Sequence, residues 1–344
     1  MKLPIAFPFA PMEAKIAAEI PAEPGWQYEP KWDGFRCIAL RDGQSVELQS
    51  KAGQSLTRYF PEIVAALSAV EPRRFVLDGE LIVPLDGRLS FDDLLQRIHP
   101  AASRVKKLSE THPAEMVVFD LLADENGTPV FEKSLAERRP LLEAFYEQYL
   151  RGNGRIVLSQ VSQDEKTARN WLKEMRGQLD GIVAKKLAEP YRSGERAMLK
   201  IKTHRSADCV VGGFRYATGK PIVGSLLLGL YDAKGLLDHV GFTSGFAATD
   251  RKSLTAKLRD LVEPPGFTGQ APGGPSRWST ERSAKWEPVK PVLVVEVQYD
   301  HFTGARFRHG TKLLRWRPDK DPHQCTLKQV QFESKVPFHR LLAS

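Results

Sequence analysis

The chain has 344 residues, 42% of them hydrophobic and 27% charged, a composition typical of a globular protein long enough for two domains. Three widely spaced cysteines without a CxxC pair argue against a disulfide framework and a zinc site. The sequence has no signal-peptide core and no long apolar segment, which argues against secretion and against a transmembrane helix. Residues 1–204 carry 29 basic and 29 acidic side chains, so residues 205–344 hold the whole net charge of +8. This uneven distribution indicates either a polyanionic partner such as nucleic acid or a basic solvated surface.

The first half of the chain alternates short strands and helices. Residues 31–40, "KWDGFRCIAL", and 45–53, "SVELQSKAG", flank the turn signal "RDGQ" and predict an antiparallel hairpin. Lys31 is unusual because it places an ammonium group in a run that is otherwise typical of a buried strand. Turn-linked strands favour an antiparallel α+β domain over a doubly wound sheet. Further extended segments are predicted at 73–85, 114–130, 154–160, 180–186 and 198–204, and helices at 57–70, 90–100, 135–150 and 164–178.

The pattern changes near Thr203 to Ser206, where a second domain is predicted to begin. One helix at 250–262 and a Gly- and Pro-rich loop at 263–288 interrupt a series of strands. This is the content of a small Greek-key barrel such as an oligonucleotide/oligosaccharide-binding (OB) fold. The strands of this domain are predicted at 208–216, 225–232, 237–246, 291–302 and 305–317.

Several charged residues lie within predicted strands. Lys200 and Lys202, in "LKIK", project from one face of a strand, and Ile201 points the other way into a core. Neighbouring ammonium groups repel unless an anion lies between them, and a phosphate is the usual candidate. Glu80 and Asp180 adjoin apolar runs and are candidate ligands for the divalent metal that accompanies a nucleotide triphosphate. Taken singly, each of these residues also fits an exposed strand face or a turn.

Together these residues predict a site with a lysine nucleophile, phosphate-binding cations and metal-binding carboxylates. A lysine attacks only as the neutral amine, so we expect burial, a metal cation or a second ammonium group to lower the pKa of Lys31 toward neutrality. Other phosphate-binding motifs fit less well. The sequence has no P-loop, and "VVGGF" lacks the spacing and the following helix of a dinucleotide fingerprint.

The ordered series "KWDGFR", "QSK", "LDGE", "VVFDLL", "DGIVAK", "LKIK" and "RWRPDK" resembles the motifs of covalent nucleotidyltransferases, specifically the ATP-dependent DNA ligases. The resemblance extends from Pro30 to Lys320, and "RYFPE", "QRIHP", "SADCVVGGF" and "RWRPDKDP" are most similar to the small bacterial ligase C type. It implies an adenylyltransferase domain over residues 1–204 and an OB-fold domain over residues 205–344. It also implies ATP as co-substrate, Mg²⁺ or Mn²⁺ as cofactor and nicked double-stranded DNA as partner.

The resemblance further implies a role for each motif residue. Lys31 would attack the α-phosphorus of ATP and carry AMP, which would pass to the 5′-phosphate of a nick before the 3′-hydroxyl displaces it. Asp180 departs from the glutamate commoner in the family, so its role is implied but its coordination geometry differs. The implied catalytic residues are Lys31, Asp33, Arg36, Lys200 and Lys202; the implied ATP-binding residues are Glu29, Lys31, Gly34, Arg36, Lys51, Glu80, Phe119, Lys185, Lys200, Lys202, Arg317 and Lys320; the implied metal ligands are Glu80 and Asp180.

The last motif belongs to the predicted second domain. Arg317, Asp319 and Lys320 match it, and its cations are expected to contact the departing pyrophosphate. Residues on a separate domain act on the nucleotide only when that domain swings toward it, which implies a hinge near Thr203 to Ser206. The alternative for Arg317 and Lys320 is a solvated turn, and the alternative for Phe119 is a plain core position.

Three classes of function fit the sequence. The first is a DNA ligase; the second is an RNA ligase or an mRNA-capping guanylyltransferase, which shares the lysine chemistry; the third is a catalytically silent DNA-binding scaffold. We expect a monomer in the bacterial cytoplasm, at the nucleoid and without membrane contact. A repair polymerase or an end-binding protein is a further candidate partner that the sequence does not identify.

Overall fold

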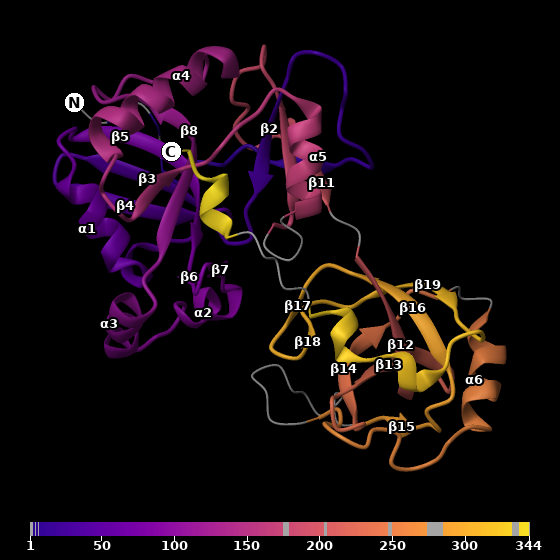
Figure 1. Ribbon diagram of the computed structural model, residues 1–344. Helices are drawn as coiled ribbons and strands as arrows, with labels where there is room; N and C mark the ends of the chain where they lie inside the picture. The colour runs from indigo at the N-terminus through magenta and orange to yellow at the C-terminus, as the bar shows by residue number, and fades with distance from the viewer. Residues whose placement is uncertain are drawn as a thin grey trace. The chain divides into compact units, whose positions relative to one another are not determined.

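The chain folds into two compact units (Figure 1). The computed structural model describes residues 3, 5, 7–174, 179–202, 205–246, 250–273, 285–331 and 337–343. The first unit comprises Met1–Thr203 and Ser334–Ser344, and the second comprises His204–Glu333. The sequence analysis assigned everything after residue 204 to the second domain, whereas the chain returns to the first unit near its C-terminus. Thr203 and His204, in the predicted hinge, lie outside the described residues.

A five-stranded sheet in the order β4-β3-β5-β8-β9 forms one half of the first unit. β3 (Phe35–Asp42) and β4 (Ser45–Ser50) make the predicted hairpin. β5 (Arg74–Ile82) pairs antiparallel with β3 and with β8 (Glu115–Ala123). β9 (Ile156–Leu158) runs parallel to β8 at the edge of the sheet.

Two helices cover one face of this sheet. α1 (Pro61–Ala69) and α4 (Leu135–Phe145) contribute to one core with alternate residues of β5, such as Phe75 and Leu77. Because strand side chains alternate between faces, the opposite face carries polar residues. Arg36, Asp78 and Glu80 lie on that face, and Arg36 is directly opposite Glu80 in the ladder.

A second sheet of the first unit has the order β1-β11-β10-β2. It consists of β1 (Ala14–Ile16), β2 (Trp26–Lys31), β10 (Gly181–Lys186) and β11 (Met198–Lys202). Helix α5 (Glu165–Glu174) packs on one face, as Figure 1 shows. The apolar residues between α5 and this sheet form a core that includes Tyr28, Ala168, Trp171, Ile182 and Ile201.

The run "KWDGFRCIAL" is not one continuous strand, and this corrects the sequence analysis. Lys31 ends β2 in one sheet, and Phe35 begins β3 in the other. Gly34 makes the crossing possible, because a Cβ there would lie 2.1 Å from the carbonyl oxygen of Leu81. The break places Lys31 between the two sheets instead of inside one of them.

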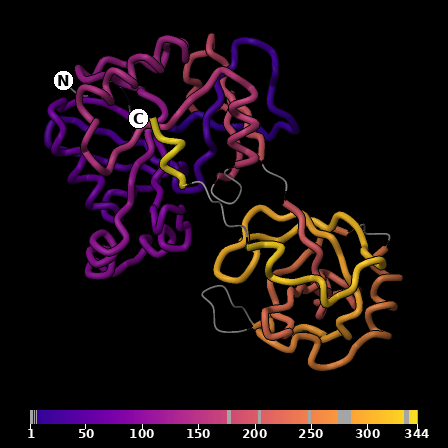
Figure 2. The backbone as a smooth tube through the Cα atoms, viewed as in Figure 1, coloured from indigo at the N-terminus to yellow at the C-terminus, as the bar shows by residue number. Residues whose placement is uncertain are grey.

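The remaining elements of the first unit are short. The C-terminal segment, Pro337–Ala343, contains the 3₁₀ helix η6 (Phe338–Leu341) and pairs with the chain next to β9 through the antiparallel bridge between Ser159 and Leu342. Figure 2 shows this yellow end of the tube among the indigo and magenta strands. The other elements are η1 (Thr57–Tyr59), β6 (Pro84–Leu85), β7 (Arg88–Leu89), α2 (Phe91–Gln96), α3 (Ala102–Thr111) and the π-helical η2 (Tyr146–Leu150).

The second unit is built on one antiparallel sheet in the order β14-β13-β12-β16-β19, with β15 also paired to β12. An isolated parallel bridge joins Thr243, the last residue of β14, to Thr311, the residue before β19. The antiparallel sheet with one helix agrees with the predicted OB fold. Within the described ranges of the whole chain, no helix is long and apolar enough to span a membrane. The elements are β12 (Arg205–Tyr216), β13 (Val223–Tyr231), β14 (Leu237–Thr243), α6 (Arg251–Arg259), β15 (Glu287–Pro288), β16 (Val294–Tyr299), β17 (Phe302–Thr303), β18 (Arg306–Phe307), β19 (Lys312–Trp316), η4 (Pro322–Gln324) and η5 (Leu327–Gln329).

Candidate active site

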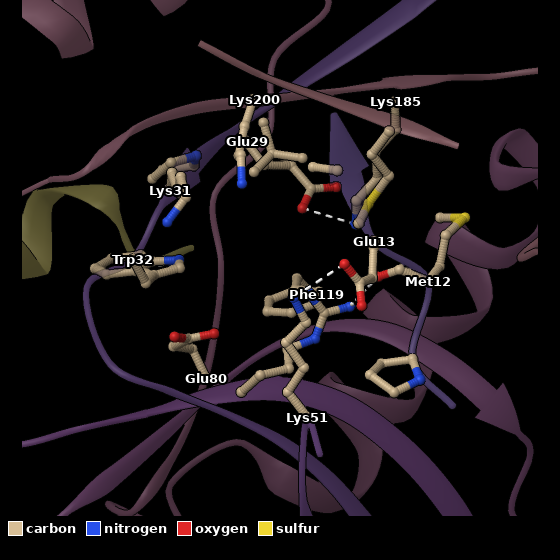
Figure 3. Close-up of a pocket in the computed structure, with 16 residues that line it drawn as sticks. Met12, Glu13, Glu29, Lys31, Trp32, Lys51, Glu80, Phe119, Lys185 and Lys200 are labelled. Carbon is tan, nitrogen blue, oxygen red and sulfur yellow. Dashed lines mark hydrogen bonds and ion pairs between the residues drawn. The ribbon is translucent and has the colours of Figure 1, made fainter. Parts of the chain in front are cut away.

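A cavity of about 190 Å³ lies between the two sheets of the first unit. Lys31 and Lys200 reach it from the β1-β11-β10-β2 sheet, and Glu80 faces them from the other sheet (Figure 3). Eight of the predicted site residues line this pocket, so the structure brings together side chains that are far apart in the sequence. They are Glu29, Lys31, Arg36, Lys51, Glu80, Phe119, Lys185 and Lys200.

Lys31 shares a carboxylate with Lys202. Lys31 and Lys202 are both opposite Gly181 in the ladder, on either side of β10. The Asp180 carboxylate lies 2.5 Å from the Lys31 Nζ and 3.4 Å from the Lys202 Nζ. Asp180 therefore neutralises part of the positive charge that the neighbouring strands bring together.

The pKa of Lys31 shifts in the direction opposite to the predicted one. Burial acts to lower it, but the negative charges of Asp180, Glu80 and Asp33 outweigh burial and hold the pKa above its ordinary value. Lys31 is therefore an ammonium group in this arrangement. To become a nucleophile it must lose the proton that Asp180 stabilises.

Lys200 is the less compensated cation of the pocket. Lys200 and Lys202 lie on the same face of β11, and Ile201 is buried in the core on the other face, which confirms the predicted alternation. Among the described residues Lys200 makes no ion pair. Burial, followed by the nearby charges of Lys31, Lys202 and Lys51, lowers the pKa of Lys200. A phosphate placed among these ammonium groups would relieve their repulsion.

Arg36 is held against the ring of Phe119. Its guanidinium donates to Asp78 at 2.6 Å and 2.5 Å, and its central carbon lies 4.6 Å from the centre of the Phe119 ring. The Tyr191 hydroxyl also donates to Asp78, at 2.6 Å. Asp78 raises the pKa of Arg36 against the effect of burial, so Arg36 stays charged. The sequence analysis missed Asp78 and Tyr191 as the residues that orient Arg36, although Asp78 belongs to the motif "LDGE".

Lys185 and Glu29 form a buried ion pair beside the same ring. The Lys185 Nζ lies 2.9 Å from the Glu29 carboxylate and 4.8 Å from the centre of the Phe119 ring. The two side chains are only 4% and 3% exposed. Gln27 donates to the other Glu29 oxygen at 2.8 Å, and Asp120 lies 3.9 Å from Lys185. This network fixes the inner wall of the pocket.

Glu80 is a carboxyl group with an unusual proton affinity. Burial raises its pKa to about 7, and the cations Lys31 and Arg36 only partly oppose this shift. Near neutral pH Glu80 is therefore divided between the protonated acid, which donates a hydrogen bond, and the carboxylate, which accepts one.

The segment before β1 completes the pocket and was missed by the sequence analysis. Met12 and Glu13 line it, and the Glu13 carboxylate accepts a hydrogen bond from Lys51 at 3.0 Å (Figure 3). Arg196 lies 3.8 Å from the same carboxylate. The backbone of Glu13 pairs with Glu195 and Met198, contacts that no local pattern of the N-terminal sequence could indicate.

The last predicted motif forms its own cluster in the second unit. Arg317 donates to Asp208 at 2.9 Å and to Asp319 at 3.0 Å, and the Lys320 Nζ lies 3.7 Å from Asp208. The hydrogen bond from Arg317 lowers the pKa of Asp319 to about 2. Asp208, which the sequence analysis did not name as a site residue, thus holds both cations of the motif.

The carboxylates of the first unit fit a magnesium-type ion better than a caged metal. No group of three or more potential ligands from His, Cys, Asp and Glu occurs in the part of the chain that the structure describes. Asp180 and Glu80 are single carboxylates in the neighbourhood of Lys31. Mg²⁺ is commonly bound by one or two carboxylates together with substrate phosphates and water, which matches this donor set.

Two protein-family models match the chain. Residues 11–202 match the ATP dependent DNA ligase domain, and residues 219–320 match the ATP dependent DNA ligase C terminal region. DNA ligase C1 of Mycolicibacterium smegmatis is 44% identical over 342 residues, and DNA ligase C of Mycobacterium tuberculosis is 42% identical over 349 residues; each alignment covers 96% of both chains. A solved structure from an analysis of Lig E DNA ligases covers 90% of this chain and 99% of its own at 16% identity, with a TM-score of 0.56, which indicates a shared fold.

Proposed function

The chain belongs to the family of ATP-dependent DNA ligases, and we propose that Lys31 is the residue that carries AMP in its reaction. The enzyme seals nicks in duplex DNA in three steps: adenylation of the protein, transfer of AMP to DNA, and formation of the phosphodiester bond. In the proposed first step the Lys31 Nζ attacks the α-phosphorus of ATP. A phosphorus–nitrogen bond forms, the bond from the α-phosphorus to the oxygen that bridges it to the β-phosphate breaks, and pyrophosphate leaves. Nζ starts as an ammonium group and releases one proton before the attack and one after it, both to solvent.

The position of Lys31 supports this assignment. It ends a strand at the wall of a cavity that also holds Lys200, whose charge a phosphate would balance. A lysine in a core has no reason to be accompanied by further ammonium groups, because each adds repulsion. A polyphosphate bound among these ammonium groups would remove the repulsion between them.

The other residues in and around the pocket have separate proposed roles. We propose that Phe119 presents its ring face to adenine, with Arg36 and Lys185 against the ring. Glu29 orients Lys185, and Asp78 orients Arg36. Lys200 and Lys202 stabilise charge that develops on the α-phosphate, which is the main form of catalysis available to phosphoryl transfer.

Asp180 and Glu80 are the proposed ligands of Mg²⁺ or Mn²⁺. A divalent cation supplies charge stabilisation to phosphate oxygens. The same two carboxylates hold the pKa of Lys31 high, so their charge has to be compensated before Lys31 becomes a neutral amine. Asp33 contributes to the same field and is proposed to orient the nucleotide or the nick.

Nicked duplex DNA is the acceptor. We propose that the basic second unit provides much of the affinity for the phosphate backbone and that Arg317 and Lys320 contact the departing pyrophosphate. Such binding weakens steeply as salt increases. A hinge near Thr203 to Ser206, a monomeric state, residence at the bacterial nucleoid, and a repair polymerase or end-binding protein as partner stay predictions.

Transfer of label from ATP tests the assignment of Lys31. The purified protein is incubated with Mg²⁺ and with ATP or GTP labelled at the α-phosphate, or with NAD labelled in its adenylate, and protein-bound label is measured after denaturation. We expect label from ATP alone, none on Lys31→Ala, and release of that label as a sealed strand after addition of nicked DNA.

Lys186→Ala is the matched control for Lys31→Ala. Lys186 is an exposed lysine at the end of β10, and its Nζ lies 5.6 Å from the centre of the Trp26 ring. It does not line the pocket, so the variant should accept label at the wild-type rate. Label that persists on Lys31→Ala would assign the nucleophile to another residue. Label from GTP would instead favour a capping-type enzyme.

A further inference from the structure

The C-terminal segment Pro337–Ala343 packs into the core beside the proposed nucleophile. Phe338 is 5% exposed and Leu341 is 2% exposed, and both belong to the same apolar cluster as Trp32, the residue after Lys31. The match to the family's C-terminal region ends at residue 320, so neither that match nor any sequence motif includes this segment.

The segment extends the sheet that carries Phe119. Gln160 donates its backbone N–H to Leu341 at 2.9 Å, and Ala343 donates to Leu158 at 2.9 Å. An antiparallel bridge joins Ser159 and Leu342 between these two bonds. The segment thereby covers the edge that follows β9, which would otherwise present unpaired backbone groups.

Ser159 links this edge to the pocket. Its backbone N–H donates to Val118, next to Phe119, at 2.9 Å. Its hydroxyl accepts a hydrogen bond from the Trp32 indole at 3.0 Å. Trp32 is 3% exposed and lines the pocket. A displacement of Ser159 would therefore move the indole that fixes the chain directly after Lys31.

We propose that Pro337–Ala343 is a positioning element for adenylyl transfer: it holds Ser159, and Ser159 holds Trp32 and the end of β2 that carries Lys31. The inference rests on the proposed role of Lys31. The segment does not line the pocket, so its loss should change the rate of the chemical step more than the affinity for ATP. A misplacement of about 1 Å at a reacting group can cost on the order of 100-fold in rate.

Leu341→Ala tests the proposal, with Leu141→Ala as the matched control. Leu141 lies on α4 and is 38% exposed, so the same truncation there removes little packing. The measurements are the thermal midpoint, and the single-turnover rate of Lys31 adenylation against ATP concentration, well below that midpoint. We expect Leu341→Ala to lower the saturating rate at least about tenfold with little change in half-saturating ATP, and Leu141→Ala to match the wild type. A folded Leu341→Ala protein with the wild-type saturating rate would overturn the proposal.

Two further variants keep the test decisive if Leu341→Ala does not fold. Ser159→Ala removes only the hydroxyl that holds Trp32 and should lower the saturating rate in the same way; an unchanged rate counts against the proposal. A chain ended at Gln331 should regain rate, in a saturable manner, when a peptide of residues 332–344 is added. A folded truncated protein that needs no peptide, or gains nothing from it, contradicts the proposal. Wild type and Lys31→Ala are labelled in parallel, because failure of that pair would refute the nucleophile and not the positioning segment.

Discussion

Replacement of Lys185 by methionine should destabilise the first unit strongly. The change keeps most of the side-chain volume and removes the charge that lies 2.9 Å from Glu29. Glu29, 3% exposed, would keep only the amide of Gln27 as a side-chain partner among the described residues. Breaking a buried ion pair in this way costs about 3–5 kcal/mol because it leaves an uncompensated charge. For a unit of this size each kcal/mol lowers the thermal midpoint by about 2–4 °C, so we expect a decrease of roughly 6–20 °C.

The assay is thermal unfolding followed by circular dichroism, with the double variant Glu29→Met, Lys185→Met as the second arm. Replacing both partners by apolar residues is often neutral or stabilising, so the double variant should regain much of the lost stability. It should still be slow to form Lys31–AMP, since the pocket has lost both groups. A single variant as stable as the wild type, or a double variant less stable than the single one, would refute the view that this pair is tightly coupled and buried.

Three further results are expected. Glu80→Gln should flatten the pH dependence of stability. The folded-state pKa of Glu80, about 7, lies above its unfolded value, so the folded wild type binds more protons between about pH 4.5 and 7 and its stability falls as pH rises. Denaturant unfolding at pH 5 and pH 8 should therefore show a gain in the free energy of unfolding of about 1–2 kcal/mol for Glu80→Gln at pH 8 only. Gly34→Ala should lower the free energy of unfolding by about 2–4 kcal/mol and abolish Lys31 adenylation, because its Cβ would meet the Leu81 carbonyl oxygen at 2.1 Å. A Cβ at Gly245 would have its nearest neighbour 3.8 Å away, so the control Gly245→Ala should match the wild type in the same urea titration. Lys200→Gln should slow Lys31 adenylation by about 100-fold without loss of thermal stability, because the change removes both a phosphate ligand and a repulsive charge. The control is Lys15→Gln, at an exposed position on β1. Equal adenylation rates for the two variants would contradict the phosphate-binding role of Lys200.

The parts of the site that the sequence predicted are those set by local alternation and by motifs. Lys200 and Lys202 share a face because strand side chains alternate, and Ile201 is buried where that period requires it. The crossing at Gly34 was missed, since an apolar run gives the same pattern whether a strand continues or the chain passes to another sheet. The direction of the Lys31 pKa shift was wrong because it depends on the distance to Asp180, which only the tertiary fold determines.

Other parts depend on contacts between distant segments. Glu13 reaches the pocket only through backbone pairing with Glu195 and Met198, and Asp208 meets Arg317 only across the sheet of the second unit. The C-terminal segment has too few residues for a periodic pattern of its own, and its partners precede the entire second unit. No single window of the sequence contains the information for such pairings.

The return of the chain to the first unit has a consequence for biosynthesis. A ribosome makes residues 158–160 long before it makes their partners at 341–343, with the whole second unit between them. Domains generally fold as units, in the order in which they emerge. Here the unit that starts first has to wait with an open strand edge until the later unit has been translated. During that interval the nascent chain exposes a strand edge that can pair with other chains, so the risk of aggregation and the benefit of a chaperone are greatest during translation of the second unit.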